Sequence, residues 1–168
     1  MLTSTGIADL ALLCFAGLTF WAAVNDILHY TIPNRICLAL VGLYPAYVVA
    51  APQSVDWLPA IAIAGATLAV GFGLFSLKLC GAGDAKLLAA VALWAGPLYA
   101  LPFIVLTTLA GGAVALFIYL QHRLARAPTP SLVAMGQADP HIGRQQMPYG
   151  AAIGIAGLYV AFTLMRIS

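Results

Sequence analysis

Residues 81–86 read GAGDAK and separate two apolar runs, LAVGFGLFSL at 68–77 and LLAAVALWAG at 87–96. An aspartate and a lysine thus follow a pair of glycines in a part of the chain that is otherwise almost without charge. Ionisable side chains within apolar segments are energetically costly, so each one is by default a hypothesis of function. This stretch therefore raises two linked questions, which are where the apolar helices end and what Asp84 does.

The composition of the whole chain is that of a membrane protein. Of its 168 residues, 63% are hydrophobic and only 7% are charged, whereas a soluble domain has roughly 25% charged residues. So few charged groups cannot cover a water-facing surface, and we expect the lipid bilayer to be the solvent. The net charge of +2 gives no argument for nucleic acid as a partner. Three scattered cysteines without a C-x-x-C pair indicate neither a zinc site nor a disulfide framework.

Apolar stretches predict six membrane-spanning helices in one transmembrane domain that covers residues 1–168. A helix needs about 20 apolar residues to cross the hydrocarbon core. The uncharged run at 87–121 is too long for one span, and AGP at 95–97 offers a break. No basic segment precedes the first apolar stretch, so we expect that stretch to be a retained anchor. The expected helices cover about 7–28, 36–52, 57–79, 84–95, 98–120 and 149–166, with a polar loop at about 121–148.

The lysines and arginines predict how these spans are oriented. Six alternating helices place the segments 29–35, 80–86 and 121–148 on one side of the membrane, with six of the seven Lys and Arg residues in or beside them. Short loops on the cytoplasmic side of a membrane are enriched in Lys and Arg. We therefore expect these segments in the cytoplasm and both termini on the opposite side. The six residues are Arg35, Lys78, Lys86, Arg123, Arg126 and Arg144, and Arg166 lies on the other side.

The same topology places two of the five aspartates at one depth on one side. Asp26 ends the first predicted helix at the cytoplasmic boundary, and Asp84 starts the fourth at the same boundary. Two carboxylates within hydrogen-bond distance cannot both ionise easily, so such a pair holds one proton and titrates as a unit. The ionised member can take a proton from water while the protonated member polarises a peptide carbonyl. The pair therefore predicts peptide hydrolysis without a covalent intermediate.

Each of these residues also has a simpler interpretation. Aspartate is a favoured helix N-cap, and Asp84 directly precedes AKLLAAVALW, while Asp26 fits an interfacial residue at a helix end. Gly81 and Gly83 permit backbone angles closed to other residues and let another chain approach closely, or they form only a tight turn. The pattern G-x-G-D alone is weak. Its position at a membrane boundary, with a second aspartate at equal depth, gives it weight.

Other chemistries find less support in the sequence. The histidines include no pair at metal-ligand spacing, and neither G-x-S-x-G nor a phosphate loop G-x-x-x-x-G-K-[ST] is present. We predict no metal and no cofactor. A small multi-pass ion or proton transporter that uses the same aspartates stays an alternative, because acids in membranes also mark ion pathways. It would favour internal repeats, of which the sequence shows no convincing example. A structural assembly subunit without catalysis is a third alternative.

Three segments resemble motifs of the prepilin peptidases, the type IV leader peptidases of the G-x-G-D aspartic protease class. GAGDAKLLAA at 81–90 resembles their G-x-G-D-x-K-L signature, and NDILHYTIPNRICL at 25–38 resembles their first aspartate motif, in which I-P-N follows the aspartate. MPYGAAIGIAG at 147–157 resembles their C-terminal P-Y-G-x-A-I segment. Longer members carry an N-terminal domain with paired C-x-x-C motifs and also methylate the new N-terminus. This chain resembles the short peptidases of the Flp-type (tight adherence) pilus systems, and methyltransferase activity is not expected.

The resemblance implies that Asp26 and Asp84 are the catalytic dyad. The expected reaction removes the short, positively charged leader of a prepilin or pseudopilin, just after a glycine and ahead of its apolar helix. The expected place is the cytoplasmic face of the bacterial inner membrane. The expected partners are therefore the prepilin and the lipid bilayer, without nucleic acid, and the oligomeric state stays open.

Further residues are candidates to support this site. Lys86 fits either a partner for a carboxylate or a topology signal, and Tyr149 fits either a hydrogen-bond donor into the site or an interfacial aromatic residue. Pro33 and Asn34 are expected to shape the turn into the second helix, because proline suits a first helical position. Glycines at 150 and 154 form G-x-x-x-G, which is typical of close helix packing. The candidates are Gly81, Gly83, Lys86, Pro33, Asn34, Tyr149 and Gly150.

Overall fold

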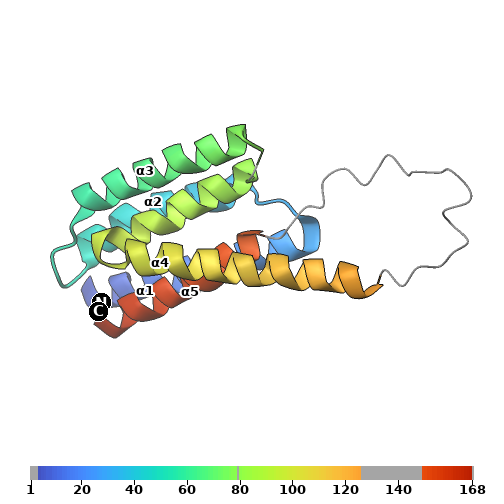
Figure 1. Ribbon diagram of the computed structural model, residues 1–168. Helices are drawn as coiled ribbons and strands as arrows, with labels where there is room; N and C mark the ends of the chain where they lie inside the picture. Colours follow the sequence, from blue (N-terminus) through green and yellow to red (C-terminus); the bar gives the residue numbers. More distant parts are fainter. Residues whose placement is uncertain (1–3, 79, 126–148, 168) are drawn as a thin grey trace, which may run out of the picture.

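The computed structural model describes residues 4–78, 80–125 and 149–167. Within these residues every regular element is a helix, which confirms the predicted all-α class (Figure 1). Most of the predicted loop 121–148, including Arg126, Asp139, His141 and Arg144, lies outside the described residues. The helices are α1 (Ser4–His29), α2 (Asn34–Ala50), α3 (Trp57–Ser76), α4 (Ala82–Ala125) and α5 (Tyr149–Ile167).

The described helices have the length and surface of a multi-pass membrane protein. Four of them, α1, α3, α4 and α5, are long and apolar enough to cross a membrane, and α2 is a shorter apolar helix. Large apolar side chains such as Leu28, Val49 and Leu101 are exposed along the outside of the bundle. Helices satisfy their own backbone hydrogen bonds, so such a surface is suited to lipid. The number of crossings and the side on which the termini lie stay predictions.

The chain reverses direction within α4, at Gly96. This residue has φ 58° and ψ −170°, which are far from helical values, and Pro97 follows it. Glycine adopts this backbone conformation readily because it has no Cβ, and proline lacks the N–H that a continuing helix would use. Figure 1 shows the segments on either side of Gly96, 82–95 and 97–125, running in opposite directions. The reversal lies within the AGP segment where the sequence predicts a break.

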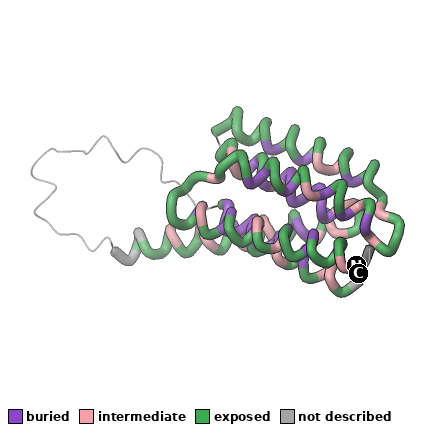
Figure 2. The backbone as a smooth tube through the Cα atoms, turned by 180° about the vertical axis from the view of Figure 1, so that it is seen from behind, coloured by how far each residue is buried: buried purple, intermediate pink, exposed green. Residues whose placement is uncertain are grey.

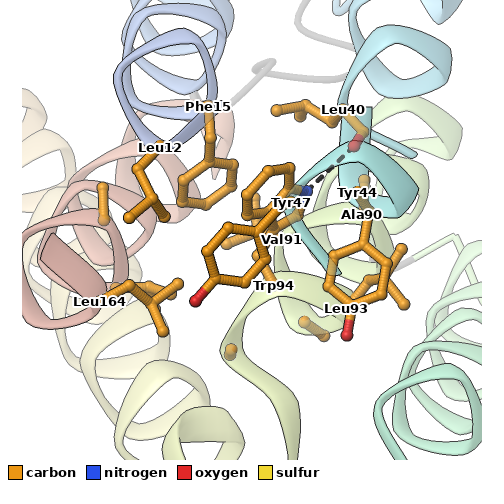
Figure 3. Packing of buried hydrophobic residues seen from close by; sticks show 14 of the residues in the cluster. Leu12, Phe15, Leu40, Tyr44, Tyr47, Ala90, Val91, Leu93, Trp94 and Leu164 are labelled. Carbon is orange, nitrogen blue, oxygen red and sulfur yellow. Dashed lines mark hydrogen bonds between the residues drawn. The ribbon is translucent and has the colours of Figure 1, made fainter. Parts of the chain in front are cut away.

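The first segment of α4 forms the centre of the bundle. Nearly all of residues 85–95 are buried, because α4 contacts α2, α3 and α5 (Figure 2). Trp94 lies in an aromatic cluster, with the Phe15 ring stacked on it at 4.4 Å and the Tyr47 ring at 5.3 Å (Figure 3). Its indole N–H donates a hydrogen bond to the Leu40 carbonyl at 3.0 Å. This cluster fixes the half of the bundle near the chain termini.

Glycines bring α5 into close contact with α1. Gly154 faces Ala23, and a Cβ added at Gly157 would lie 2.5 Å from Cγ2 of Thr19. Such small residues let membrane helices pack backbone to backbone. Because 150, 154 and 157 recur at helical spacing, the same face of α5 continues to Gly150, which lies against the last turn of α1. The packing of α5 therefore determines what surrounds Asp26.

Candidate active site

Asp26 is a buried carboxylate in the last turn of α1, with 4% of its surface exposed. Its Oδ2 accepts a hydrogen bond of 3.3 Å from the N–H of Ala151, in the first turn of α5. The first N–H groups of a helix have no partner within the helix and favour negative charge. A Cβ added at Gly150 would lie 2.7 Å from Cγ of Asp26, so only glycine leaves room for the carboxylate there.

Asp84 lies in the first turn of α4 and is half-buried. The first intrahelical bond runs from the Ala85 N–H to the Gly81 carbonyl at 3.1 Å, so Gly81 is the N-cap residue. Oδ2 of Asp84 accepts a hydrogen bond of 3.2 Å from the Gly81 N–H, as the third residue of a capping box does. The simpler interpretation of Asp84 as the N-cap is therefore wrong, because the N-cap lies three residues earlier and Asp84 is the third residue of the helix. Its carboxylate points back to the cap.

The two carboxylates lie at the same end of the bundle. This end is opposite the chain termini, because α1 ends there and α4 begins there (Figure 1). The connection that follows α1 packs against Gly83, the residue before Asp84, so the end of α1 and the start of α4 lie side by side. Both aspartates thus lie at one end of the bundle, and their pairing in one site stays a prediction. Among the described residues, no group of three or more His, Cys, Asp or Glu side chains has an arrangement that could hold a metal ion.

The connection from α1 to α2 starts at Tyr30, which is bonded to the backbone of Asp26. The Tyr30 N–H donates to the Asp26 carbonyl at 2.8 Å, and Tyr30 adopts a left-handed φ of 51°, as residues that end helices often do. The side-chain amide of Asn25 donates to the Thr31 carbonyl. The following residue, Ile32, lies against the start of α4. These contacts hold the connection close to both aspartates.

Gly83 and Asn34 mark where this connection meets α4. A Cβ added at Gly83 would lie 3.2 Å from Cβ of Ile32 and 3.6 Å from its backbone N and O. Pro33 is the N-cap of α2 and not its first helical residue, since it has ψ 131° and the helix begins at Asn34. Oδ1 of Asn34 accepts a hydrogen bond of 2.9 Å from Nζ of Lys86. The partner of this exposed lysine is thus a neutral amide.

Tyr149 contacts α4 through its ring. It begins α5 and is 36% exposed. A Cβ added at Gly111 would lie 3.2 Å from Cε1 of the Tyr149 ring. Within the described residues its hydroxyl makes no hydrogen bond to either aspartate, so the predicted donor role has no support from this geometry.

Several groups at this end cannot be predicted from the sequence alone. The N–H of Ala151 donates a hydrogen bond to Asp26. Every residue except proline carries a backbone N–H, so the residue type at 151 does not predict this contact. Asn25 and Ile32 lie inside the motif at 25–38. Only the fold shows that Asn25 donates a hydrogen bond to the Thr31 carbonyl and that Ile32 packs against Gly83. Glycine at 150 and 154 predicts close helix packing, and the structure identifies α1 as the partner helix and adds Gly157 to the same face.

A cavity of about 190 Å³ lies at the other end of the bundle. It is lined by residues of the α2–α3 connection, by aromatic side chains that include Tyr44 and Tyr47, and by the reversal at Gly96. Gly96 lies twelve positions after Asp84 in α4, which is roughly 18 Å of helix. The cavity is therefore distinct from the place where the aspartates meet.

Comparison with known families gives a match to the model of the type IV leader peptidase family over residues 13–116, which is well over half of the chain. This range includes both aspartates, whereas the motif at 147–157 lies beyond it. Comparisons with curated proteins and with solved structures gave no match. The family match and the resemblance seen in the sequence agree. The chain belongs to the type IV leader peptidase family.

Proposed function

We propose that the protein is an aspartic endopeptidase that removes the leader of type IV prepilins, with Asp26 and Asp84 as its catalytic pair. Membership of the family implies a peptidase whose substrates are prepilins. The observation that supports the dyad is the position of both aspartates at one end of an apolar bundle, where the connection after α1 packs against the start of α4. Acids in such surroundings are rare, and a close pair of them is the arrangement that hydrolysis by activated water requires.

Each acid is anchored in a way that leaves capacity for a reaction. The Ala151 N–H donates to Oδ2 of Asp26 and the Gly150 N–H also bonds this carboxylate, while the Gly81 N–H donates to Oδ2 of Asp84. An ionised carboxylate has about four lone-pair sites, so one or two such bonds fix its orientation and leave acceptors for water and a peptide group. Fixed acids at a helix end are pre-organised for catalysis, because they need not reorient during the reaction.

The reaction then runs through one water molecule held between the carboxylates. The ionised acid takes a proton from the water, and the water oxygen forms a bond to the scissile carbonyl carbon. The protonated acid gives its proton to the carbonyl oxygen, which yields a neutral tetrahedral diol. Collapse of the diol breaks the C–N bond and returns one hydroxyl proton to the acid that gave its own. The departing amine takes the proton that came from the water, and the pair again shares one proton.

The finer features of the proposal come from the sequence. The surplus of Lys and Arg near this end supports a cytoplasmic site, where a positively charged leader would meet it. The substrate's apolar helix would stay in the bilayer of the bacterial inner membrane. The similarity to short Flp-type peptidases supports small Flp-like prepilins as substrates, without methylation of the product.

The test is leader removal by the purified protein in liposomes that contain a Flp-type prepilin. Asp26→Asn and Asp84→Asn should each lower kcat by more than about 100-fold, because each removes a group that moves a proton. Asp9→Asn is the matched control, since Asp9 lies exposed on the same helix as Asp26. Full processing by either site variant would refute the dyad. An ion flux that Asp84→Asn abolishes, without any cleavage by the wild-type protein, would support the transporter instead.

A further inference from the structure

We propose that the hydrogen bond between Lys86 and Asn34 is a positioning contact that sets the separation of the two aspartates. The inference rests on the proposed function, because it assigns these residues a role in the same reaction. It concerns residues that touch neither the scissile bond nor the water. Their effect is transmitted through residues 30–34, which are the connection from α1 to α2 and the first residue of α2. In space, these residues lie between the end of α1 and the start of α4.

The α1 side of this connection is fixed to Asp26. The carbonyl of Asp26 accepts the Tyr30 N–H at 2.8 Å, and the amide of Asn25 holds the Thr31 carbonyl. Tyr30 and Thr31, the first two residues of the connection, are therefore both bonded to the last turn of α1. Displacement of residues 30–31 would pull on the backbone of Asp26, whose side chain has almost no free space beside Gly150.

The α4 side is fixed next to Asp84. Ile32 contacts Gly83 closely enough that a Cβ there would be 3.2 Å away, and Lys86 bonds Asn34 at 2.9 Å. Gly83 and Lys86 flank Asp84 within the first turns of one helix. The contact at Gly83 limits how near the connection can come to α4, and the bond at Lys86 limits how far it can move away. Together they fix how far the connection after Asp26 lies from the first turn of α4, which carries Asp84.

Lys86 is suited to this role and poorly suited to a direct one. Its side chain is exposed, and its recorded partner is an amide oxygen, not a carboxylate. The lysine stem reaches across from α4 to the first residue of α2, and the amide accepts without adding a further negative charge beside the pair. Loss of the bond should therefore loosen the geometry while leaving both acids chemically intact.

Steady-state cleavage kinetics in liposomes test this role. Lys86→Met and Asn34→Leu should each lower kcat about tenfold with KM nearly unchanged, because misplacement of a catalytic group lowers the rate more than it weakens binding. The double variant should be no worse than the poorer single variant, since both remove one contact. Lys86→Arg keeps a donor and should recover most of the rate. Lys78→Met, which removes another exposed lysine near the same end, is the matched control and should leave kcat unchanged.

A second measurement reads the distance between the connection and α4 without relying on activity. Cysteines at 32 and 83 should cross-link after a shift of a few tenths of an ångström, because the Cβ separation of 3.2 Å lies just below the range of about 3.5–4.5 Å found in disulfides. Lys86→Met should slow this cross-linking severalfold, and Lys78→Met should leave it unchanged. The background for this measurement replaces the native cysteines Cys14, Cys37 and Cys80.

The outcomes separate this proposal from the dyad itself. Additive losses of kcat in the double variant, a rise in KM in place of a fall in kcat, or cross-linking that is independent of Lys86 would each overturn the positioning role. Full cleavage by Asp26→Asn or Asp84→Asn would overturn the proposed function instead, and the cross-linking result would still report whether Lys86 and Asn34 hold the connection against α4.

Discussion

The two ends of the bundle are built on opposite principles. At the aspartate end the contacts are made by glycines, helix termini and short polar side chains, with Gly150 against Asp26 and Gly81 beneath Asp84. At the other end, large rings fill the space between helices, with Phe15 and Trp94 stacked at 4.4 Å. Removal of Cβ atoms brings polar groups close together, whereas aromatic packing buries apolar surface.

The two ends should therefore contribute to different properties, the aromatic end to stability and the aspartate end to catalytic rate. The aromatic end supplies a large part of the packing that holds α1, α2 and α4 together, and the glycine end supplies close approach with little room for error. Substitutions at the first end should act on stability and those at the second on rate. A substitution at the aromatic end that lowers kcat without a loss of stability, or one at the aspartate end that lowers stability without a change in kcat, would contradict this assignment.

Trp94→Ala should have the largest effect, and that effect should be on stability. It removes a ring that contacts Phe15, Tyr44 and Tyr47, together with the indole N–H that donates to the Leu40 carbonyl. We expect a loss of about 3–5 kcal/mol in the free energy of unfolding, as for other buried aromatic residues replaced by alanine. Denaturation in detergent measures it. The fraction that stays folded should cleave at the wild-type rate, because Asp84 lies about 15 Å away along the helix.

Trp57→Ala is the matched control for this change, because Trp57 begins α3 and is exposed. Its loss should change the free energy of unfolding by less than about 0.5 kcal/mol. A Trp94→Ala protein that is as stable as the wild type but cleaves slowly would show that the aromatic end takes part in the chemistry.

Gly150→Ala should have the next largest effect, on rate. The added methyl group would overlap Cγ, Cβ and Oδ2 of Asp26, which lie 2.7–2.8 Å from its position. Asp26 or the start of α5 must then shift, and a displacement of about 1 Å in a catalytic group can lower kcat roughly 100-fold. Cleavage kinetics measure the change. Gly17→Ala is the control, because nothing lies within 4 Å of a Cβ there. Unchanged kcat in Gly150→Ala would mean that the position of Asp26 is not critical.

The sequence predicts the aromatic end poorly and the aspartate end partly, for physical reasons. Asp26 and Asp84 are conspicuous because charge is scarce in this chain, and alternating spans place them at one depth. The break at 95–97 is marked by glycine followed by proline, whose backbone preferences are local. Such signals survive in a single sequence because they depend on one residue and its neighbours.

What the sequence does not predict depends on contacts between distant segments. The Ala151 N–H reaches Asp26 from 125 positions along the chain, and the Lys86–Asn34 bond joins residues 52 positions apart. From the sequence alone, Lys86 therefore fits two roles equally well. The N-cap interpretation of Asp84 was wrong for a local reason: glycine at 81 caps the helix, and the carboxylate joins the cap from inside the first turn.

Cys80 offers a smaller effect that reports on Asp84 directly. Burial raises the pKa of the Cys80 thiol, and the negative charge of Asp84 raises it further, so little thiolate forms at neutral pH. Asp84→Asn removes one of the causes that raise this pKa. The thiolate fraction at a given pH should then increase, and alkylation of Cys80 should become faster. The rate is measured against pH in a protein that retains Cys80 as its single cysteine.

Asp9→Asn should leave the alkylation of Cys80 unchanged, since Asp9 is near the opposite end of α1. If Asp84→Asn also leaves the rate unchanged while Cys80 stays accessible, the carboxylate of Asp84 does not face this thiol. The start of α4 would then be arranged differently from the capping geometry described above.

Tyr149→Phe should have the smallest effect of all. The ring, and not the hydroxyl, contacts Gly111, so loss of the hydroxyl should leave kcat within about twofold and stability within about 0.5 kcal/mol. Tyr149→Ala removes the ring and should cost about 1 kcal/mol in the free energy of unfolding. Tyr159→Phe, on the same helix, is the matched control. A large fall in kcat for Tyr149→Phe with unchanged stability would place a phenol in the reaction, because packing alone does not depend on the hydroxyl. The aspartate end would then rely on a side-chain donor as well as on glycines and backbone N–H groups.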